Sequence, residues 1–165
     1  MLNDQDVTRW LDENQISATL VYPAAPTPTV AAAASAVGVS TEQIIKSVLF
    51  TIDQQNLLVI TNGKSTIDRR LIAERFQVGR KRVKLATAEH VENITGYSVG
   101  GVPPFAHISK LTTWIDPKVL EQDVVYAGGG SSNALIRIET RVLISATDAT
   151  ITPVSRSSDA NEHDH

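Results

Sequence analysis

Hydrophobic positions along this chain occur in short runs, and their spacing alternates irregularly between the helical and the strand period. Val7, Trp10 and Leu11 recur at helical spacing, whereas residues 48–52 are almost all apolar and β-prone, which predicts a buried strand. Short strands interleaved with short helices favour an α+β fold or a mixed barrel over a doubly wound sheet. Strands are expected at residues 17–22, 48–52, 57–61, 83–85, 111–115, 124–126 and 135–138.

Capping residues predict where the helices begin. Asn3 can cap a first helix, Thr27 a second and Thr66 a third. A further short helix is expected over residues 87–95, while residues 140–146 fit either a helix or a strand.

The chain is expected to form one domain. Its 165 residues suffice for one hydrophobic core, and no internal repeat is visible. We assign residues 1–153 to the domain and residues 154–165, which are small, polar and charged, to a disordered tail. His163 and His165 lie in that tail, and two histidines without a fixed scaffold make a poor metal site.

The composition argues against several classes of protein. No run of 18 apolar residues is present, so no membrane span is expected. The first residues are acidic and polar, unlike a signal peptide, and a cytoplasmic location is expected. The lack of cysteine excludes disulfides, thiolate zinc sites and a cysteine nucleophile.

Positive charge is concentrated in one stretch, although the net charge is -3. Eight of the 15 basic residues lie between Lys64 and Lys84, where only Asp68 and Glu74 oppose them, an excess of six. Such a stretch can bind a phosphate backbone. Charge alone fits a solvated basic surface slightly better.

The stretch Gly100-Gly101-Val102-Pro103-Pro104-Phe105 is the most informative. Its glycines let backbone N–H groups approach a ligand, and its prolines restrict the chain. The loop therefore suits an oxyanion hole for a carbonyl oxygen, and it suits a tight turn between core elements equally well.

Other candidate groups are individually weak. Lys46 precedes the buried strand and can bind a phosphate or a ribose oxygen, although an arbitrary lysine more often reaches solvent. The loop at 128–133 either forms a site wall or is a flexible hairpin connection, and it lacks the P-loop ending. Asp68 fits the first turn of a helix without any function. No catalytic triad, metal motif or carboxylate pair appears.

Together and in this order, the segments resemble the YbaK/ProX family of aminoacyl-tRNA deacylases, which is also the editing insertion domain of bacterial prolyl-tRNA synthetases. The combination of Lys46 with Gly-Gly-Val-Pro-Pro-Phe about 55 residues later is more specific than either part alone. The resemblance covers about residues 3–146. The matching segments are IIKSVLF at 44–50, IDRRLIA at 67–73, TGYSVGGVPPFAH at 95–107 and AGGGSSN at 127–133.

The resemblance implies a mixed β-barrel-like sheet surrounded by short helices. It also implies hydrolysis of the ester between a wrong amino acid and the terminal adenosine of tRNA, with tRNA(Pro) as the substrate and prolyl-tRNA synthetase as a possible partner. No metal, cofactor or covalent enzyme intermediate is implied. The vicinal ribose hydroxyl and a bound water do much of the chemistry, while the protein supplies shape and polarisation.

The resemblance also implies residue roles. Lys46 binds the terminal ribose or phosphate, and the N–H groups of Gly100, Gly101 and Val102 bind the ester carbonyl. Some relatives carry a histidine in the last glycine loop, where this chain has Ser131 and Ser132. The remaining substrate-binding residues are Pro103, Pro104, Phe105, Asp68, Gly129, Ser131 and Asn133, and the candidate tRNA contacts are Arg69, Arg70, Arg80, Lys81, Arg82 and Lys84.

Two alternatives compete with the deacylase. One is a non-catalytic module that binds an aminoacyl ester, a nucleotide or tRNA without turnover. The other is a regulatory partner of a synthetase, whose function would survive the loss of Lys46. The intact lysine and Gly/Pro motif favours the deacylase.

Overall fold

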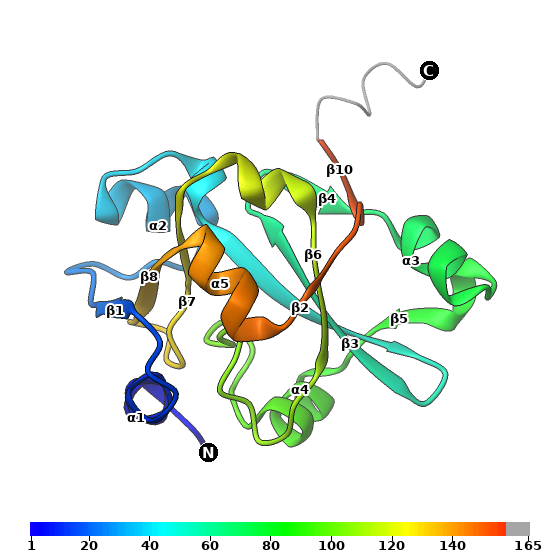
Figure 1. Cartoon of the computed structure of the whole chain (residues 1–165), viewed down its shortest axis with the longest axis horizontal. Helices are drawn as coiled ribbons and strands as arrows, with labels where there is room; N and C mark the ends of the chain where they lie inside the picture. Colours follow the sequence, from blue (N-terminus) through cyan, green and yellow to red (C-terminus); the bar gives the residue numbers. More distant parts are fainter. Residues whose placement is uncertain (158–165) are drawn as a thin grey trace.

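Three β-sheets and a set of short helices make up residues 1–157, the part of the chain that the computed structural model describes (Figure 1). The strands are β1 (Ala18–Val21), β2 (Ile45–Ile52), β3 (Gln55–Asn62), β4 (Ser65–Ile67), β5 (Val83–Leu85), β6 (Thr112–Ile115), β7 (Val124–Gly128), β8 (Leu135–Glu139), β9 (Thr150–Ile151) and β10 (Ser155–Ser157). The α-helices are α1 (Asp4–Glu13), α2 (Val30–Val37), α3 (Arg69–Phe76), α4 (Ala88–Thr95) and α5 (Thr140–Thr147), and the 3₁₀-helices are η1 (Thr41–Gln43), η2 (Arg80–Arg82) and η3 (Pro117–Glu121). Within these residues no helix combines the length and apolar character needed to cross a membrane.

The largest sheet has the strand order β5-β2-β3-β6-β9 and is packed on both faces. Alternation along the β2–β3 hairpin directs Phe50 and Val59 into one cluster with Ile72 of α3. Leu58 points to the other face and packs near Val91 of α4. Burial on both faces explains why residues 48–52 of β2 are almost all apolar.

The smaller sheet, with the order β1-β8-β7, encloses the central core together with α1 and α5. Ile45 and Ile60 of the large sheet meet Ile136 and Ile138 of the small sheet in this core. The mixed α+β fold is therefore as predicted. The barrel-like closure is not observed, because among the described residues β10 and β4 form a third sheet and the three sheets stay separate.

The predicted cap Asn3 is confirmed, and the structure adds Thr87 as the cap of α4. The side chain of Asn3 accepts a hydrogen bond from the backbone of Gln5 at 2.9 Å, and Thr87 accepts one from His90 at 3.2 Å. The ambiguous segment 140–146 forms helix α5.

The other two predicted caps are wrong. Helix α2 begins later than expected, and Thr29 rather than Thr27 caps it through a 3.0 Å bond from the backbone of Ala32. Thr66 lies in strand β4, where it pairs with β10, and Asp68 caps α3 instead. A tertiary strand pairing that local sequence does not reveal has displaced the helix start.

The beginning of the predicted tail belongs to the fold. Val154 is fully buried, and the next residues form β10 against β4. The carboxylate of Asp116, itself buried, accepts hydrogen bonds from the N–H of Val154 at 2.9 Å and from the N–H and hydroxyl of Ser155 at 3.0 and 2.8 Å. The rest of the predicted tail, with His163 and His165, lies outside the described residues.

Substitution of Asp116 by alanine should destabilise the protein by about 2–4 kcal/mol, because it leaves several buried donors without an acceptor. Urea unfolding followed by circular dichroism measures this change. Asp12→Ala removes an exposed acid of α1 and should change the free energy of unfolding by less than about 0.5 kcal/mol. Equal effects of the two substitutions would contradict the anchoring role of Asp116.

Candidate functional site

A cavity of about 270 Å³ opens where β2 begins, between the start of α2 and two glycine-rich loops. It contains three of the four residues predicted to be catalytic, namely Lys46, Gly100 and Val102. Across residues 1–157 no group of three His, Asp or Glu side chains could hold a metal ion. The full lining is Thr27, Pro28, Thr29, Val30, Ala33, Ile44, Ile45, Lys46, Ser47, Gly100, Val102, Gly128 and Leu135.

Lys46 is the only charged residue of this lining. It is the second residue of β2, within the strand rather than before it as predicted, and it is partly buried. Its ammonium donates a hydrogen bond to the carbonyl of Ser65 at 3.1 Å, and burial lowers its pKa. No carboxylate among residues 1–157 forms an ion pair with it, so the ammonium can bind an oxygen of a ligand.

The first glycine loop offers backbone donors to the cavity. Gly100 has φ +96°, a conformation that favours glycine, and no atom lies within 4 Å of where its Cβ would be. The N–H of Gly101 donates to the carbonyl of Ser98 at 3.0 Å and is already in use. The N–H groups of Gly100 and Val102 have no acceptor within the described residues, which leaves these two as the candidate oxyanion donors.

The second glycine loop packs against the first, backbone to backbone. The N–H of Gly130 donates to the carbonyl of Gly101 at 2.8 Å. A Cβ on Gly128 would lie 2.5 Å from the carbonyl oxygen of Val102, and a Cβ on Gly101 would lie 3.2 Å from backbone atoms of Gly130 and Ser131. Side chains at these positions would therefore push the loops apart.

A second cavity of about 530 Å³ adjoins the first and shares Thr27, Pro28 and Gly100 with it. Its walls are the segment 23–28 on one side and Ser132 with Asn133 on the other. Asn133 is thus brought to the site as predicted. The sequence did not single out the segment 23–28 as part of the site, although its three prolines suit a fixed wall.

Two other residues predicted for the amino-acid pocket lie outside both cavities. The N–H of Gly129 donates to the carbonyl of Ala134 at 3.0 Å, within the loop. The hydroxyl of Ser131 donates to the carboxylate of Asp4 at 2.9 Å, away from the lining. Both residues therefore support the second glycine loop without lining either cavity.

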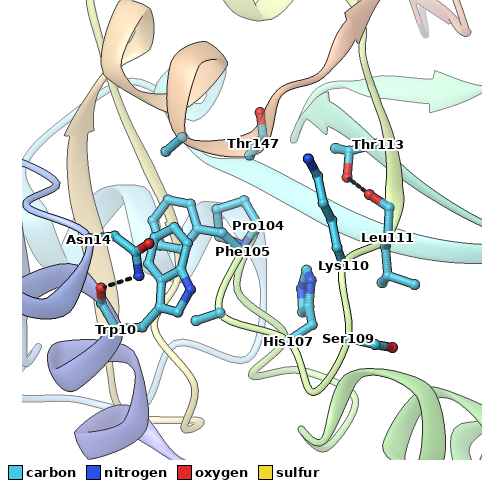
Figure 2. A pocket seen from close by; sticks show the side chains of 12 residues that line it. Trp10, Asn14, Pro104, Phe105, His107, Ser109, Lys110, Leu111, Thr113 and Thr147 are labelled. Atoms are coloured by element: carbon cyan, nitrogen blue, oxygen red, sulfur yellow. Dashed lines mark hydrogen bonds between the residues drawn. The ribbon is translucent and has the colours of Figure 1, made fainter.

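Pro104 and Phe105 line a different cavity, of about 310 Å³, together with Trp10 (Figure 2). Phe105 stacks on Trp10 with ring centroids 4.6 Å apart and planes 13° apart. His107 contacts the carbonyl of Pro103 through Nε2 at 2.8 Å. A carbonyl only accepts, so Nε2 carries the hydrogen, and burial lowers the pKa of the ring. These contacts hold the loop from the side opposite Lys46, and the structure does not bring Pro104 or Phe105 to the Lys46 cavity.

Asp68 also lies outside the cavities and caps α3. Its carboxylate accepts a bond from the backbone of Arg70 at 3.0 Å and pairs with the Arg70 guanidinium at 3.2 Å. Hydrogen bonds from Arg70 lower the pKa of Asp68. These contacts account for Asp68 as a local structural residue.

The six candidate tRNA contacts lie on α3, η2 and β5, at the far end of β2 from Lys46 (Figure 1). Lys84 pairs with Thr51, five residues along the strand from Lys46, which corresponds to about 17 Å. Arg82 pairs with Asp53 at 2.6 Å, and Arg69 lies 5.8 Å from the ring centre of Phe50. Arg70 pairs with Asp68. The other three candidates, Arg80, Lys81 and Lys84, form no ion pair within residues 1–157.

The sequence pattern of the aminoacyl-tRNA editing domain matches residues 24–146. This range contains Lys46, both glycine loops and every residue that lines the first cavity. The chain belongs to this family. The resemblance seen in the sequence is confirmed at the level of the editing-domain family.

Individual relatives of this editing domain agree with the assignment. The chain is 30% identical over 137 residues to the uncharacterized protein YwhH of Bacillus subtilis (strain 168), which covers 82% of this chain and 83% of that protein. The crystal structure of hypothetical protein APE2540 superposes with a TM-score of 0.83 at 33% identity, over 92% of this chain and 99% of that chain. The structure of a "putative trans-editing enzyme for prolyl tRNA synthetase" superposes with a TM-score of 0.85 at 29% identity, over 93% of this chain and 97% of that one.

Substitution of Gly128 by alanine should destabilise the editing domain by about 1–3 kcal/mol, because the new Cβ meets the rigid carbonyl of Val102. Gly79→Ala is the matched control, since nothing lies within 4 Å of a Cβ at that glycine. The control should change the free energy of unfolding by less than about 1 kcal/mol. Thermal unfolding compares the two, and equal stability would show that the loops can separate without cost.

Proposed function

We propose that the protein is a trans-editing hydrolase that cleaves the ester of a mischarged aminoacyl-tRNA, namely tRNA(Pro) carrying a small wrong amino acid. The observation that carries this proposal is the single cavity lined by Lys46, Gly100 and Val102. One cation and two backbone donors that have no acceptor among residues 1–157 line this cavity, a combination that supports the chemistry of ester hydrolysis. The choice of tRNA(Pro) rests on the similarity to a structure described as a trans-editing enzyme for prolyl-tRNA synthetase.

Lys46 binds the terminal adenosine of the tRNA in this proposal. Its ammonium donates to a ribose oxygen or to the neighbouring phosphate, an interaction strengthened by the partial burial of the amine. Because a bond to a charged group is worth about 1.5–3 kcal/mol, its loss corresponds to about a tenfold to hundredfold change in rate or binding.

The N–H groups of Gly100 and Val102 bind the ester carbonyl oxygen. They stabilise the negative charge that develops on this oxygen when a water molecule attacks the carbonyl carbon. The bond from that carbon to the ribose oxygen then breaks, and a proton from the water passes to the ribose oxygen. The products are the free amino acid and a tRNA with an intact terminal ribose. An activated ester is labile, so positioning and polarisation suffice for this reaction.

The amino acid enters the second cavity, between the proline-rich segment 23–28 and Asn133. Prolines fix the backbone of one wall, so the width of the cavity limits the side chains that fit. The site works where tRNA is aminoacylated, which places the protein in the cytoplasm with prolyl-tRNA synthetase as its functional partner.

Single-turnover hydrolysis of tRNA(Pro) charged separately with alanine, cysteine, serine and proline tests the proposal. We expect rapid loss of at least one small wrong amino acid, with prolyl-tRNA(Pro) spared. Lys46→Met keeps the aliphatic stem and should slow hydrolysis about a hundredfold. Binding of the tRNA without hydrolysis of any of the four esters would instead favour the non-catalytic module.

The stability of Lys46→Met separates lost chemistry from lost fold. Burial lowers the pKa of Lys46, so keeping this amine charged at neutral pH lowers the free energy of unfolding. The variant should therefore be at least as stable as the wild type near pH 7, and the difference should shrink as the pH rises through the lowered pKa. Thermal unfolding between pH 7 and 10 measures this trend. A variant that is less stable at pH 7 would indicate a structural role for the ammonium.

The basic surface should contribute to tRNA binding through phosphates. Joint substitution of Arg80, Lys81 and Lys84 by alanine should weaken tRNA binding and lower the slope of log Kd against log salt by about 2–3, because each phosphate contact contributes about 0.7–0.9. The matched control removes the same charge elsewhere by substituting Lys110, Lys118 and Arg141. Equal slopes for both triple variants would exclude a specific contact with this surface.

A further inference from the structure

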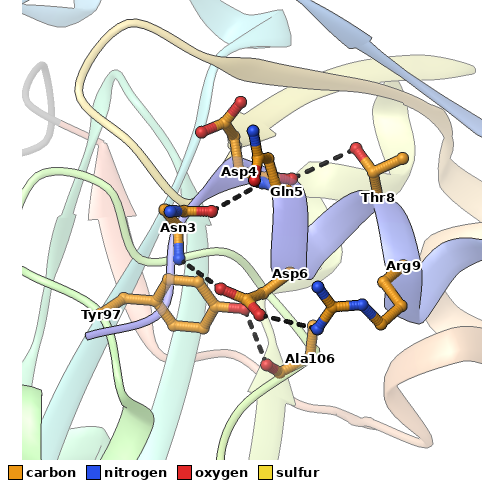
Figure 3. A network of polar contacts seen from close by, with 8 residues as sticks. All are labelled: Asn3, Asp4, Gln5, Asp6, Thr8, Arg9, Tyr97 and Ala106. Atoms are coloured by element: carbon orange, nitrogen blue, oxygen red, sulfur yellow. Dashed lines mark hydrogen bonds and ion pairs between the residues drawn. The ribbon is translucent and has the colours of Figure 1, made fainter.

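The first turn of α1 contains two acids that make different kinds of contact (Figure 3). Asp6 contacts residues of its own helix end, accepting bonds from the backbone of Asn3 at 2.9 Å and from Arg9 at 3.0 Å. The side chain of Asp4 leaves the turn on another side and reaches two distant segments. It accepts bonds from the hydroxyls of Tyr22 at 2.6 Å and Ser131 at 2.9 Å.

The two partners of Asp4 each adjoin one wall of the second cavity. Tyr22 immediately precedes Pro23, where the wall 23–28 begins, and Ser131 immediately precedes Ser132 of the opposite wall. The Ser131 hydroxyl also accepts a bond from the N–H of Asp4 at 3.1 Å. One carboxylate therefore joins the ends of both walls.

The backbone of α1 reinforces this connection at the second glycine loop. Gly130 has φ +96°, and a Cβ there would lie 2.9 Å from the carbonyl oxygen of Asn3 and 2.8 Å from Val7. The N–H of Gly130 in turn bonds to Gly101. A shift of the start of α1 would thus reach the loop that holds the candidate oxyanion donors.

The bonds to Asp4 join a charged acceptor to neutral hydroxyl donors. Hydrogen bonds from Tyr22 and Ser131 lower the pKa of Asp4, so the carboxylate stays charged at neutral pH. The same contact raises the pKa of Tyr22, so its hydroxyl stays a donor. Hydroxyl bonds to a carboxylate are roughly twice as strong as bonds between neutral groups.

We propose that Asp4 is a positioning residue that fixes the width of the second cavity by joining Tyr22 and Ser131, and thereby sets the size of the amino acid that is hydrolysed. This role rests on the proposed editing function. Loss of the carboxylate frees both walls, the cavity widens, and proline gains access beside alanine.

Hydrolysis of alanyl- and prolyl-tRNA(Pro) by Asp4→Ala tests this role. The preference for alanine over proline should fall about tenfold, because prolyl-tRNA(Pro) gains access to the widened cavity. Asp12→Ala is the matched control, since it removes the same charge from an exposed position of the same helix and should keep the preference. Tyr22→Phe and Ser131→Ala should each lower the preference, but neither should lower it further in the Asp4→Ala background.

Hydrogen exchange of the Gly130 amide provides a readout that needs no substrate. Exchange should be faster in Asp4→Ala and unchanged in Asp12→Ala. Wild-type preference together with wild-type exchange in Asp4→Ala would overturn the proposal, as would equal changes in the two variants. If the wild-type protein hydrolyses none of the alanyl, cysteinyl, seryl and prolyl esters, the editing function fails, and the amide exchange alone decides whether Asp4 holds the loop.

Discussion

Close contact between two glycine-rich loops determines most of the site. Gly130 donates to the carbonyl of Gly101, and Gly128 lies so near the carbonyl of Val102 that no side chain fits between them. The loops are far apart in sequence, yet their backbones meet without intervening side chains. This contact brings the end of the small sheet beside the Gly/Pro loop, and the cavity forms where both loops meet the start of β2.

The burial of Lys46 follows from the same arrangement. A lysine at the second position of a central strand has little room to reach solvent once α2 and the glycine loops cover that end of the sheet. Its desolvation costs stability, and only one carbonyl, that of Ser65, compensates it. A cavity charge without an opposite charge beside it is a common mark of a binding site, because a ligand can supply the missing partner.

Local features such as a helix cap could be predicted from the sequence. The cavity that each residue of the Gly/Pro loop lines could not. Asn3 was recognisable as a cap because capping depends on neighbouring residues, whereas Thr66 was misassigned because it pairs with a strand ninety residues away. Lys46 could be singled out by its place before an apolar run. Phe105 could not be separated from Gly100 by sequence, although they line different cavities.

The two sides of the Gly/Pro loop therefore contribute differently to the site: one faces the cavity and the other packs against the rest of the protein. Gly100 and Val102 face the Lys46 cavity with free donors, while the prolines and Phe105 pack toward Trp10 and His107 behind them. Donors that stabilise developing charge must be held rigidly before the reaction begins. The stacked rings and the His107 bond to the loop provide that rigidity from one side, and the second glycine loop, joined to α1, provides it from the other. The first turn of α1 thus belongs to the support of the site even though it lines neither of the two joined cavities.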